Sequence, residues 1–265
     1  MTSYVIRGGE EGKARLRILS HALWPTTLNL LQRAGIKPGM ACLDVGCGGG
    51  DVTLEMARLI GSSGRVTGID MDSTKLHLAQ QDAERQTVAN LTFLALDIAD
   101  LDYEAEYDFV YARLLLTHLR DPAQALHRML KAAKPGGVVV VEDMDHSGVF
   151  CHPPSSALEQ HVSLYNQVAR SRGADPEIGP KLPALFHQVG LQDVNLLHVQ
   201  PAFKEGTGKQ IHQITLQNIA PALLAAGLAT EAEITALFSE LADFAQDAQT
   251  IMSFPRIFQV WAYRS

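Results

Sequence analysis

The chain has 265 residues, of which 46% are hydrophobic and 19% are charged, and its formal net charge is -7 at pH 7. These values are ordinary for a soluble globular protein, and they exclude intrinsic disorder, collagen-like repeats and a disulfide scaffold. The acidic balance argues against a surface built for nucleic-acid phosphates. The three cysteines suit a reducing compartment, the first twenty residues are rich in charge, and no apolar stretch is long enough to span a bilayer. We therefore expect a cytoplasmic protein that binds neither nucleic acid nor membrane.

Helix and strand patterns alternate along the first 145 residues. Apolar residues at helical spacing predict helices over 14–34, 51–60, 73–86 and 122–134. Short buried-type runs between and after them predict strands over 41–45, 65–70, 91–96, 107–111 and 138–142. Because unbroken apolar strands separated by helices are typical of a parallel sheet covered on both faces, we expect a doubly wound α/β fold.

The alternation loosens after residue 145. Helices are expected over 155–171 and 181–189 and after the capping box at 230–233, and strands over 194–199 and 257–263. We expect one domain with a mainly parallel seven-stranded sheet and helices on both faces, whose core covers about 36–145, 181–200 and 256–265. The segments 146–180 and 203–252 are expected to be helical insertions that form a cap. That cap could cover a pocket or form the interface of a homodimer.

A glycine-rich loop joins the first predicted strand to the next helix, with the sequence Gly46-Cys47-Gly48-Gly49-Gly50. Glycines let the backbone turn sharply and approach a ligand at a helix N-terminus, although a tight turn alone also needs them. A dinucleotide fingerprint requires its third glycine one residue later, where this chain has Asp51, and no Gly-Lys-Ser/Thr follows as in a phosphate-binding loop. The loop therefore favours a ligand without a pyrophosphate.

Two aspartates follow the next two predicted strands. Asp70 ends the second strand, about twenty residues after the last loop glycine, where a carboxylate can accept both ribose hydroxyls of a nucleoside. Asp97 ends the third strand and could accept a hydrogen bond from an adenine amino group. Each aspartate alone could equally be a helix cap or a turn residue.

Four segments together resemble one family. Residues 43–50 resemble motif I of the class I S-adenosylmethionine-dependent methyltransferases, and 68–72 resemble that family's acidic second-strand end. Residues 95–98 resemble its third-strand motif, and 130–137 resemble its Pro-Gly-Gly turn before the fifth strand. The resemblance spans about 38–145 and implies a Rossmann-like fold, S-adenosylmethionine as cofactor and methyl transfer as activity.

The resemblance also implies a set of cofactor contacts. The loop would face the methionine part, the second-strand end the ribose and the adenine ring, and the third-strand end the adenine amine. An arginine after the fourth strand would contact the cofactor's amino-acid end or the reacting centre. These expected cofactor-binding residues are Gly46, Cys47, Gly48, Asp70, Met71, Asp97, Ile98 and Arg113. Asp44 is expected to support the loop from below.

A catalytic base should lie after the fourth or fifth strand, at the carboxyl edge of the sheet. We expect His118 to fill this role, with a packing histidine as the alternative. Asp143, Asp145 and His146 could form a divalent-metal cluster, but loop carboxylates are usually solvated, and we expect no metal. Tyr4 and Tyr165 could close over the site or simply pack.

The acceptor is bounded mainly by exclusion. Residues 112–115 lack the Asp/Asn/Ser-Pro-Pro-Tyr/Phe motif of DNA-amino methyltransferases, and only Cys151 could offer a thiol near the acceptor. We therefore expect methyl transfer to an oxygen or nitrogen atom of a small, partly hydrophobic molecule. The alternative is a cofactor-binding protein of the same fold without methyl transfer, either cyclase-like or a structural partner. A nicotinamide-dependent dehydrogenase is a third, weaker hypothesis.

Overall fold

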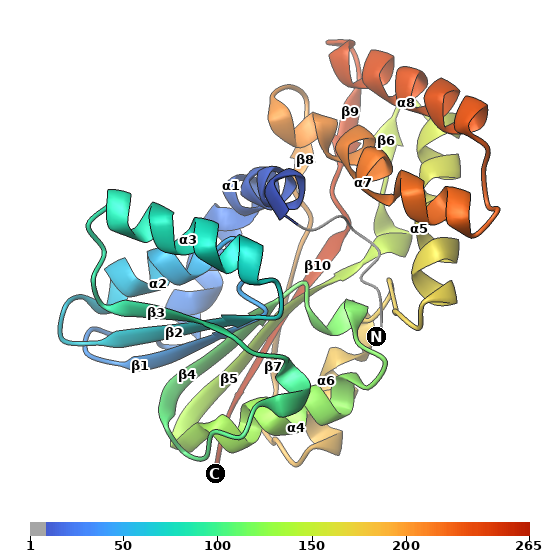
Figure 1. Cartoon of the computed structure of the whole chain (residues 1–265). Coiled ribbons are helices and arrows are strands. Elements are labelled where there is room, and N and C mark those ends of the chain that lie inside the picture. The colour runs from blue at the N-terminus through green and yellow to red at the C-terminus, as the bar shows by residue number, and fades with distance from the viewer. Residues whose placement is uncertain (1–8) are drawn as a thin grey trace.

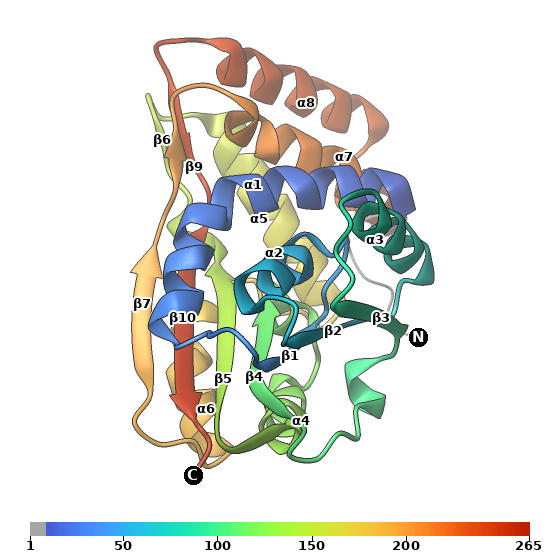
Figure 2. The ribbon, with the colours of Figure 1, turned by 90° about the vertical axis from the view of Figure 1, so that its left-hand side faces the viewer.

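Seven strands form one sheet in the order β3-β2-β1-β4-β5-β10-β7 (Figures 1 and 2). The computed structural model describes residues 9–265, with side chains from Arg15 onward. All neighbouring pairs from β3 to β5 are parallel, whereas β10 is antiparallel to β5 and to β7. The expected doubly wound, mainly parallel sheet is confirmed. Its strands are β1 (Ala41–Val45), β2 (Arg65–Asp70), β3 (Leu91–Ala95), β4 (Tyr107–Arg113), β5 (Ala133–Asp145), β7 (Asn195–Val199) and β10 (Arg256–Tyr263).

Helices cover both faces of this sheet (Figure 1). One face carries α2 (Asp51–Ile60), α3 (Ser73–Arg85) and the end of α1 (Gly9–Arg33), which bury Leu30, Met56 and Ile60 against the strands. The other face carries α4 (Pro122–Ala132) and α6 (Leu182–Gln188), which bury Met129 and Phe186. The start of α4 is as expected. The Asp121 side chain accepts a hydrogen bond from the Gln124 N–H, and Pro122 occupies the first helical position, where a backbone N–H would have no partner within the helix.

Helix α1 bends near Pro25, as Figure 2 shows. Proline removes one backbone hydrogen bond and crowds the preceding turn, so a helix kinks where it occurs. The bend lets one helix serve two cores. Leu19 and Leu23 pack into the cap, whereas Leu30 and Leu31 pack onto the sheet.

The cap consists of α5 (Ser156–Ser171), α7 (Ile211–Ala225) and α8 (Glu231–Gln246), and its buried core includes Leu164 and Leu223. The capping box at Thr230 is present at the start of α8. A three-stranded sheet in the order β6-β9-β8 was not predicted, because its strands β6 (Cys151–His152), β8 (Ala202–Phe203) and β9 (Ile251–Ser253) are too short to carry a hydrophobic pattern. Short 3₁₀ turns complete the chain: η1 (Ile98–Asp100), η2 (Leu116–His118), η3 (His146–Gly148), η4 (Gly179–Lys181) and η5 (Thr207–Gln210).

The predicted bounds of β5 were wrong at both ends. The strand begins at Ala133 rather than at residue 138, because Ala133 pairs with Tyr107 before a register shift between Tyr107 and Phe109. It continues to Asp145 because β10 pairs with its last residues in antiparallel register. The extension carries the backbone of β5 from the sheet toward the cap (Figure 1). From residue 9 onward, the structure has no helix that combines the length and apolar character of a bilayer span.

Candidate active site

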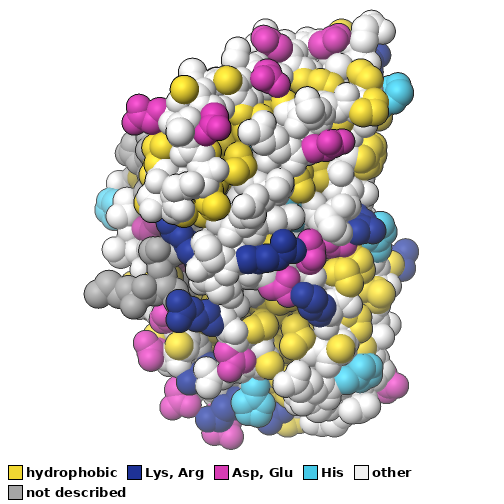
Figure 3. Space-filling view, turned by 90° about the vertical axis from the view of Figure 1, so that its right-hand side faces the viewer, with side chains coloured by type: hydrophobic (Ala, Val, Ile, Leu, Met, Phe, Trp, Pro, Cys, Tyr) yellow, Lys and Arg dark blue, Asp and Glu magenta, His cyan; other side chains and the backbone are white. Residues whose placement is uncertain are grey.

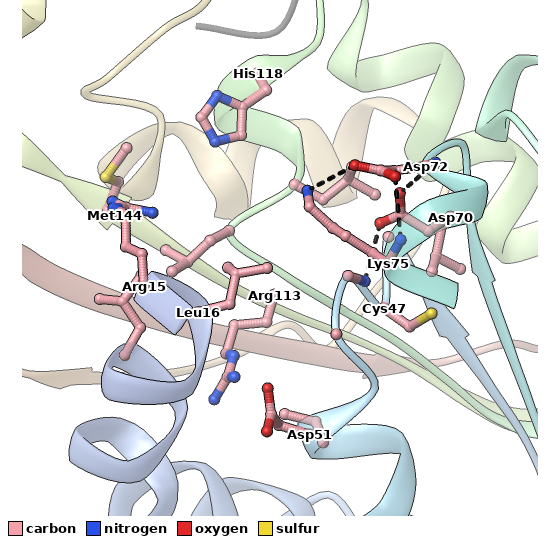
Figure 4. A pocket seen from close by; sticks show the side chains of 18 of the residues that line it. Arg15, Leu16, Cys47, Asp51, Asp70, Asp72, Lys75, Arg113, His118 and Met144 are labelled. Carbon is pink, nitrogen blue, oxygen red and sulfur yellow. Dashed lines mark hydrogen bonds and ion pairs between the residues drawn. The ribbon is translucent and has the colours of Figure 1, made fainter. Parts of the chain in front are cut away.

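A cavity of about 640 Å³ lies between the carboxyl edge of the sheet and the cap. We call its two parts the loop end and the cap end. The loop end is lined by 46–49, 70–72 and 96–98, which follow β1, β2 and β3. The cap end is lined by side chains from α1, η3, α5 and α7, namely Arg15, His146, His161, Tyr165 and His212. Arg113 and His118 lie between the two ends, and Met144 lies at the cap end beside Arg15 (Figure 4).

The glycines of the loop are required by both backbone conformation and space. Gly46, Gly48 and Gly50 have φ values of 70°, 55° and 77°, a left-handed region that side chains rarely adopt. A Cβ atom at Gly46 would lie 2.8 Å from Leu115 Cδ1, and one at Gly50 would lie 2.7 Å from Phe93 Cζ. The loop therefore presents bare backbone to the cavity at the N-terminus of α2, as close approach to a ligand requires.

Asp70 is held in place by backbone donors (Figure 4). Its Oδ2 accepts a hydrogen bond from the Gly48 N–H at 2.9 Å, and its Oδ1 accepts one from the Asp72 N–H at 2.9 Å. Asp72 in turn caps α3 and lies 3.6 Å from Lys75 Nζ. Each oxygen of Asp70 keeps acceptor capacity, so the carboxylate can receive two hydroxyl donors from the cavity.

The other expected adenosine contacts lie along the same edge. Met71 is 66% exposed and lines the cavity next to Asp70, where a ligand can cover it. Asp97 caps η1 by accepting a hydrogen bond from the Ala99 N–H at 2.9 Å, and Ile98 lies beside it. The structure thus brings the three predicted strand ends together around one cavity, although Asp97 also has the capping role that was the alternative.

A cluster of buried polar side chains lies beneath the glycine loop. Asp44 Oδ2 accepts a hydrogen bond from Thr53 Oγ1 at 2.6 Å, and burial raises the pKa of Asp44 to about 6. Thr27 Oγ1 donates to Glu142, at 2.9 Å from Oε1 and 3.0 Å from Oε2, and it lies 3.4 Å from Arg113 Nη1. Burial also raises the pKa of Glu142, an effect that the Arg113 charge opposes. Arg113 therefore compensates buried carboxylates as well as lining the cavity, where Figure 4 shows it facing Asp51.

His118 lies in η2 at the roof of the cavity (Figure 4). Burial, followed by the charges of Arg15 and Lys75, lowers the pKa of His118 to about 3. The imidazole is therefore neutral at neutral pH and carries a lone pair that can accept a proton. Its role as a catalytic base stays a prediction.

The residues considered for a metal cluster are engaged elsewhere. Asp143 accepts hydrogen bonds from the backbone N–H groups of Thr117 and Met144, and Asp145 forms an ion pair with Arg256 at 2.6 Å. Within the described part of the chain, no group of three or more His, Cys, Asp or Glu side chains is placed to hold a metal ion. Tyr165 is buried and its ring lies 4.4 Å from that of His146, a packing arrangement, whereas Tyr4 lies outside the described residues.

The cap end contains polar residues that the sequence analysis missed. Arg15 is 9% exposed and donates from Nε to Thr215 Oγ1 at 3.1 Å. His161 is fully buried, and its ring lies 5.3 Å from that of His212 and 6.4 Å from that of His146. The signal available for His161 was its helical spacing on the apolar face of α5, three residues after Leu158 and four before Tyr165.

Comparisons with known proteins agree with this geometry. The family described as "Methyltransferase domain" matches residues 36–198. The chain is 30% identical over 173 residues to a ubiquinone biosynthesis O-methyltransferase of Hydrogenovibrio crunogenus, which covers 64% of this chain and 70% of that protein. It is 33% identical over 121 residues to a 2-phytyl-1,4-naphthoquinone methyltransferase of Nostoc, which covers 44% of this chain and 52% of that protein. The chain spans about half the length of several of the curated relatives it matches.

Solved structures share the fold at low sequence identity. The crystal structure of the cyclase SpnF matches with a TM-score of 0.54 and 18% identity, covering 91% of this chain and 81% of that one. The likeness shows the fold alone, since the same sheet supports unrelated chemistries. Because the family match covers more than half of the chain and includes the loop and strand ends that build the cavity, this protein belongs to the class I S-adenosylmethionine-dependent methyltransferases.

Proposed function

We propose that the protein transfers a methyl group from S-adenosylmethionine to an oxygen or nitrogen atom of a small, partly hydrophobic molecule. The observation that carries this proposal is one continuous cavity with two unlike ends. The loop end fits a nucleoside, with bare glycine backbone, a carboxylate that can accept two hydroxyls and an exposed methionine. The cap end leaves room for a second molecule.

The residues of the chain have three tasks in this reaction. S-adenosylmethionine supplies a methyl group that is already activated on a sulfonium, so the protein mainly has to align the acceptor with it. Such positioning contributes about 7–11 kcal/mol in favourable cases. The loop and Asp70 hold the donor, the apolar cap excludes water, and His118 accepts the proton that the acceptor atom loses when its bond to the methyl carbon forms.

The relatives support an apolar acceptor. Their names specify ubiquinone biosynthesis and a naphthoquinone with a phytyl chain, both of which involve largely hydrocarbon molecules. The cap end of this chain has matching apolar walls from Leu19, Leu23, Met144, Ile211 and Phe254. The acceptor we propose therefore presents its polar reacting atom to the middle of the cavity and its apolar body to the cap.

Thermal unfolding tests the cofactor. The midpoint should rise with S-adenosylhomocysteine and S-adenosylmethionine but not with NADH, since a ligand at one hundred times its Kd stabilises by about 2.7 kcal/mol. A shift with NADH alone would instead support a dehydrogenase. A folded sample that responds to neither sulfur nucleoside would contradict the proposal.

The second candidate is a cofactor-binding protein of this fold that transfers no methyl group. A protein named as a cyclase shares this fold, so the fold by itself does not require methyl transfer. Release of S-adenosylhomocysteine that depends on an added acceptor separates the two. A protein that binds the cofactor but releases none of this product with any phenol, amine or quinol would support the second candidate.

A homodimer is a further part of the proposal, with the cap as its interface. Figure 3 shows hydrophobic side chains on the outer face of the cap, interrupted by acidic ones. Phe150 and Leu224 are exposed large apolar residues in the cap region. Sedimentation across a concentration series tests the dimer, and a monomer throughout would favour the cap as a cover for the cavity.

A further inference from the structure

Arg15 places a positive charge inside the cap end of the cavity. It is 9% exposed and lines the cavity, and its side chain rises from α1 toward Met144 (Figure 4). Its partner is the neutral hydroxyl of Thr215, and within the described residues it forms no ion pair. Buried charges are normally paired, because removing an ion from water is costly. The geometry therefore leaves room for a negative charge that the described residues do not provide.

Three histidines, His146, His161 and His212, line the cap end together with this guanidinium. The Arg15 charge contributes to lowering the pKa of His118, His146, His161 and His212. All four are neutral at neutral pH, so none adds a positive charge and none offsets that of Arg15. The carboxylate that acts on His146 is Asp145, and it is already paired with Arg256.

His161 adds unused hydrogen-bonding capacity at the same end. It is fully buried and lines the cavity, and neither of its ring nitrogens has a hydrogen-bond partner among the described residues. Its neighbour His212 is different, because His212 Nε2 lies 2.8 Å from the Ser253 carbonyl oxygen and donates to it. A neutral histidine has one donor and one acceptor nitrogen, so His161 can bind a polar group of a ligand.

We infer that the cap end is the acceptor subsite for a small apolar molecule that carries, apart from its reacting atom in the middle of the cavity, one anionic oxygen group, a carboxylate or a phenolate, which pairs with Arg15 and accepts a hydrogen bond from His161. This inference rests on the proposed function, because it names the acceptor of that reaction. The apolar walls take the hydrocarbon body, and the guanidinium provides the counter-charge. A cationic acceptor is disfavoured, since it would meet both Arg15 and the positive sulfonium of the donor.

Binding of simple probes to the protein saturated with S-adenosylhomocysteine tests the inference by calorimetry. The probes are 1-naphthoate for a carboxylate, 4-nitrophenolate for a phenolate and 1-naphthamide as a neutral control. At least one anion should bind more tightly than the amide. Arg15→Gln should weaken the binding of that anion at least tenfold. His161→Phe should weaken its binding about threefold or more.

The matched control is Arg17→Gln, because Arg17 is two residues away on α1, exposed and paired with Asp82. It should leave anion binding unchanged. Affinity for S-adenosylhomocysteine should be unchanged in every variant, which also shows that each is folded. If Arg15→Gln does not fold, Arg15→Met keeps the apolar stem and serves in its place.

The outcomes separate the two proposals. If the wild-type protein does not bind S-adenosylhomocysteine, the proposed function fails. If it binds the nucleoside, three results overturn the inference alone: the amide binds as well as both anions, no probe binds, or the anion binds as tightly to the Arg15 variant. If Arg15→Gln weakens the binding of only one of the two anions, that anion identifies the oxygen group that the subsite recognises.

Discussion

The two ends of the cavity are built in different ways. The loop end comes from three consecutive strand ends, and its contacts are mostly backbone, as with the Gly48 N–H that holds Asp70. The cap end comes from side chains that are far apart in sequence, such as Arg15 on α1 and Thr215 on α7. The loop end therefore follows from local motifs, whereas the cap end exists only when α1, α5 and α7 pack together.

This difference in construction corresponds to the two proposed roles, cofactor binding at the loop end and acceptor binding at the cap end. Under the proposed function, the cofactor binds at the end that short motifs build. The acceptor binds among the cap helices, whose side chains can change without disturbing the loop. We expect substitutions at one end to leave the other end functional, and the following predictions test this independence.

The largest effect is expected from Leu223→Ala. Leu223 is fully buried in the cap core, and truncation of a buried leucine costs about 2–5 kcal/mol. Urea unfolding should show this loss, while calorimetry in the folded range should show unchanged affinity for S-adenosylhomocysteine. A parallel loss of nucleoside affinity would mean that the two ends are coupled through α1.

His118→Ala should lower kcat about 100-fold, the lower end of the range for a general base, because the low pKa of His118 makes it a weak one. Binding of S-adenosylhomocysteine should be unaffected. His127→Ala is the control, since His127 is an exposed histidine on α4. Normal turnover in the His118 variant would show that this histidine only packs at the roof of the cavity.

Asp70→Ala should weaken the binding of S-adenosylhomocysteine by about 1.5–3 kcal/mol, because a hydrogen bond to a charged group contributes about that much. Asp100→Ala, at an exposed position in η1, is the matched control. Calorimetry measures both affinities. Equal affinities for the two variants would remove Asp70 from the site, and a fall in anionic-probe binding to Asp70→Ala would break the independence of the two ends.

The smallest effect concerns acid pH. Burial lowers the pKa of His146 to about 3 and that of His212 to about 4, from 6.5, and it lowers the pKa of His161 as well. As the pH falls, these histidines are protonated in the unfolded chain before they are protonated in the folded protein. The stability that they contribute above pH 6.5 is therefore lost as the pH falls. At pH 5 the loss is about 2 kcal/mol for each of His146 and His212, and the pKa of His161 is shifted in the same direction.

His161→Phe should reduce the loss of unfolding free energy between pH 7 and pH 5 by about 1–2 kcal/mol, as urea titrations at the two pH values can measure. Asp143 has the opposite effect, because burial raises its pKa to about 7 and the folded state therefore gains stability as the pH falls. This effect is the same in wild type and variant, so the comparison between them cancels it. An unchanged difference between the two pH values would mean that His161 is already protonated, or solvated, in the folded protein.

Short-range patterns predicted most of the sheet. The glycine loop, the strand ends at Asp70 and Asp97 and the cap of α4 were all expected, because each depends on residues within one turn or one strand. The small sheet of β6, β9 and β8 was not expected, since strands of two or three residues form only where distant segments already lie together. The extension of β5 to Asp145 similarly required its partner β10.

The site divides along the same line. The sequence alone determined the fold class, the loop and the family, because backbone conformation and strand order follow from local composition and spacing. Only the tertiary structure decided that Arg15, from the first helix, lines one cavity with histidines of η2, η3, α5 and α7. It also decided that Asp143 is bound by backbone N–H groups and Asp145 by Arg256, and that His161 is buried with no hydrogen-bond partner among the described residues. Burial and charge compensation depend on what packs around a side chain, and no local pattern contains that information.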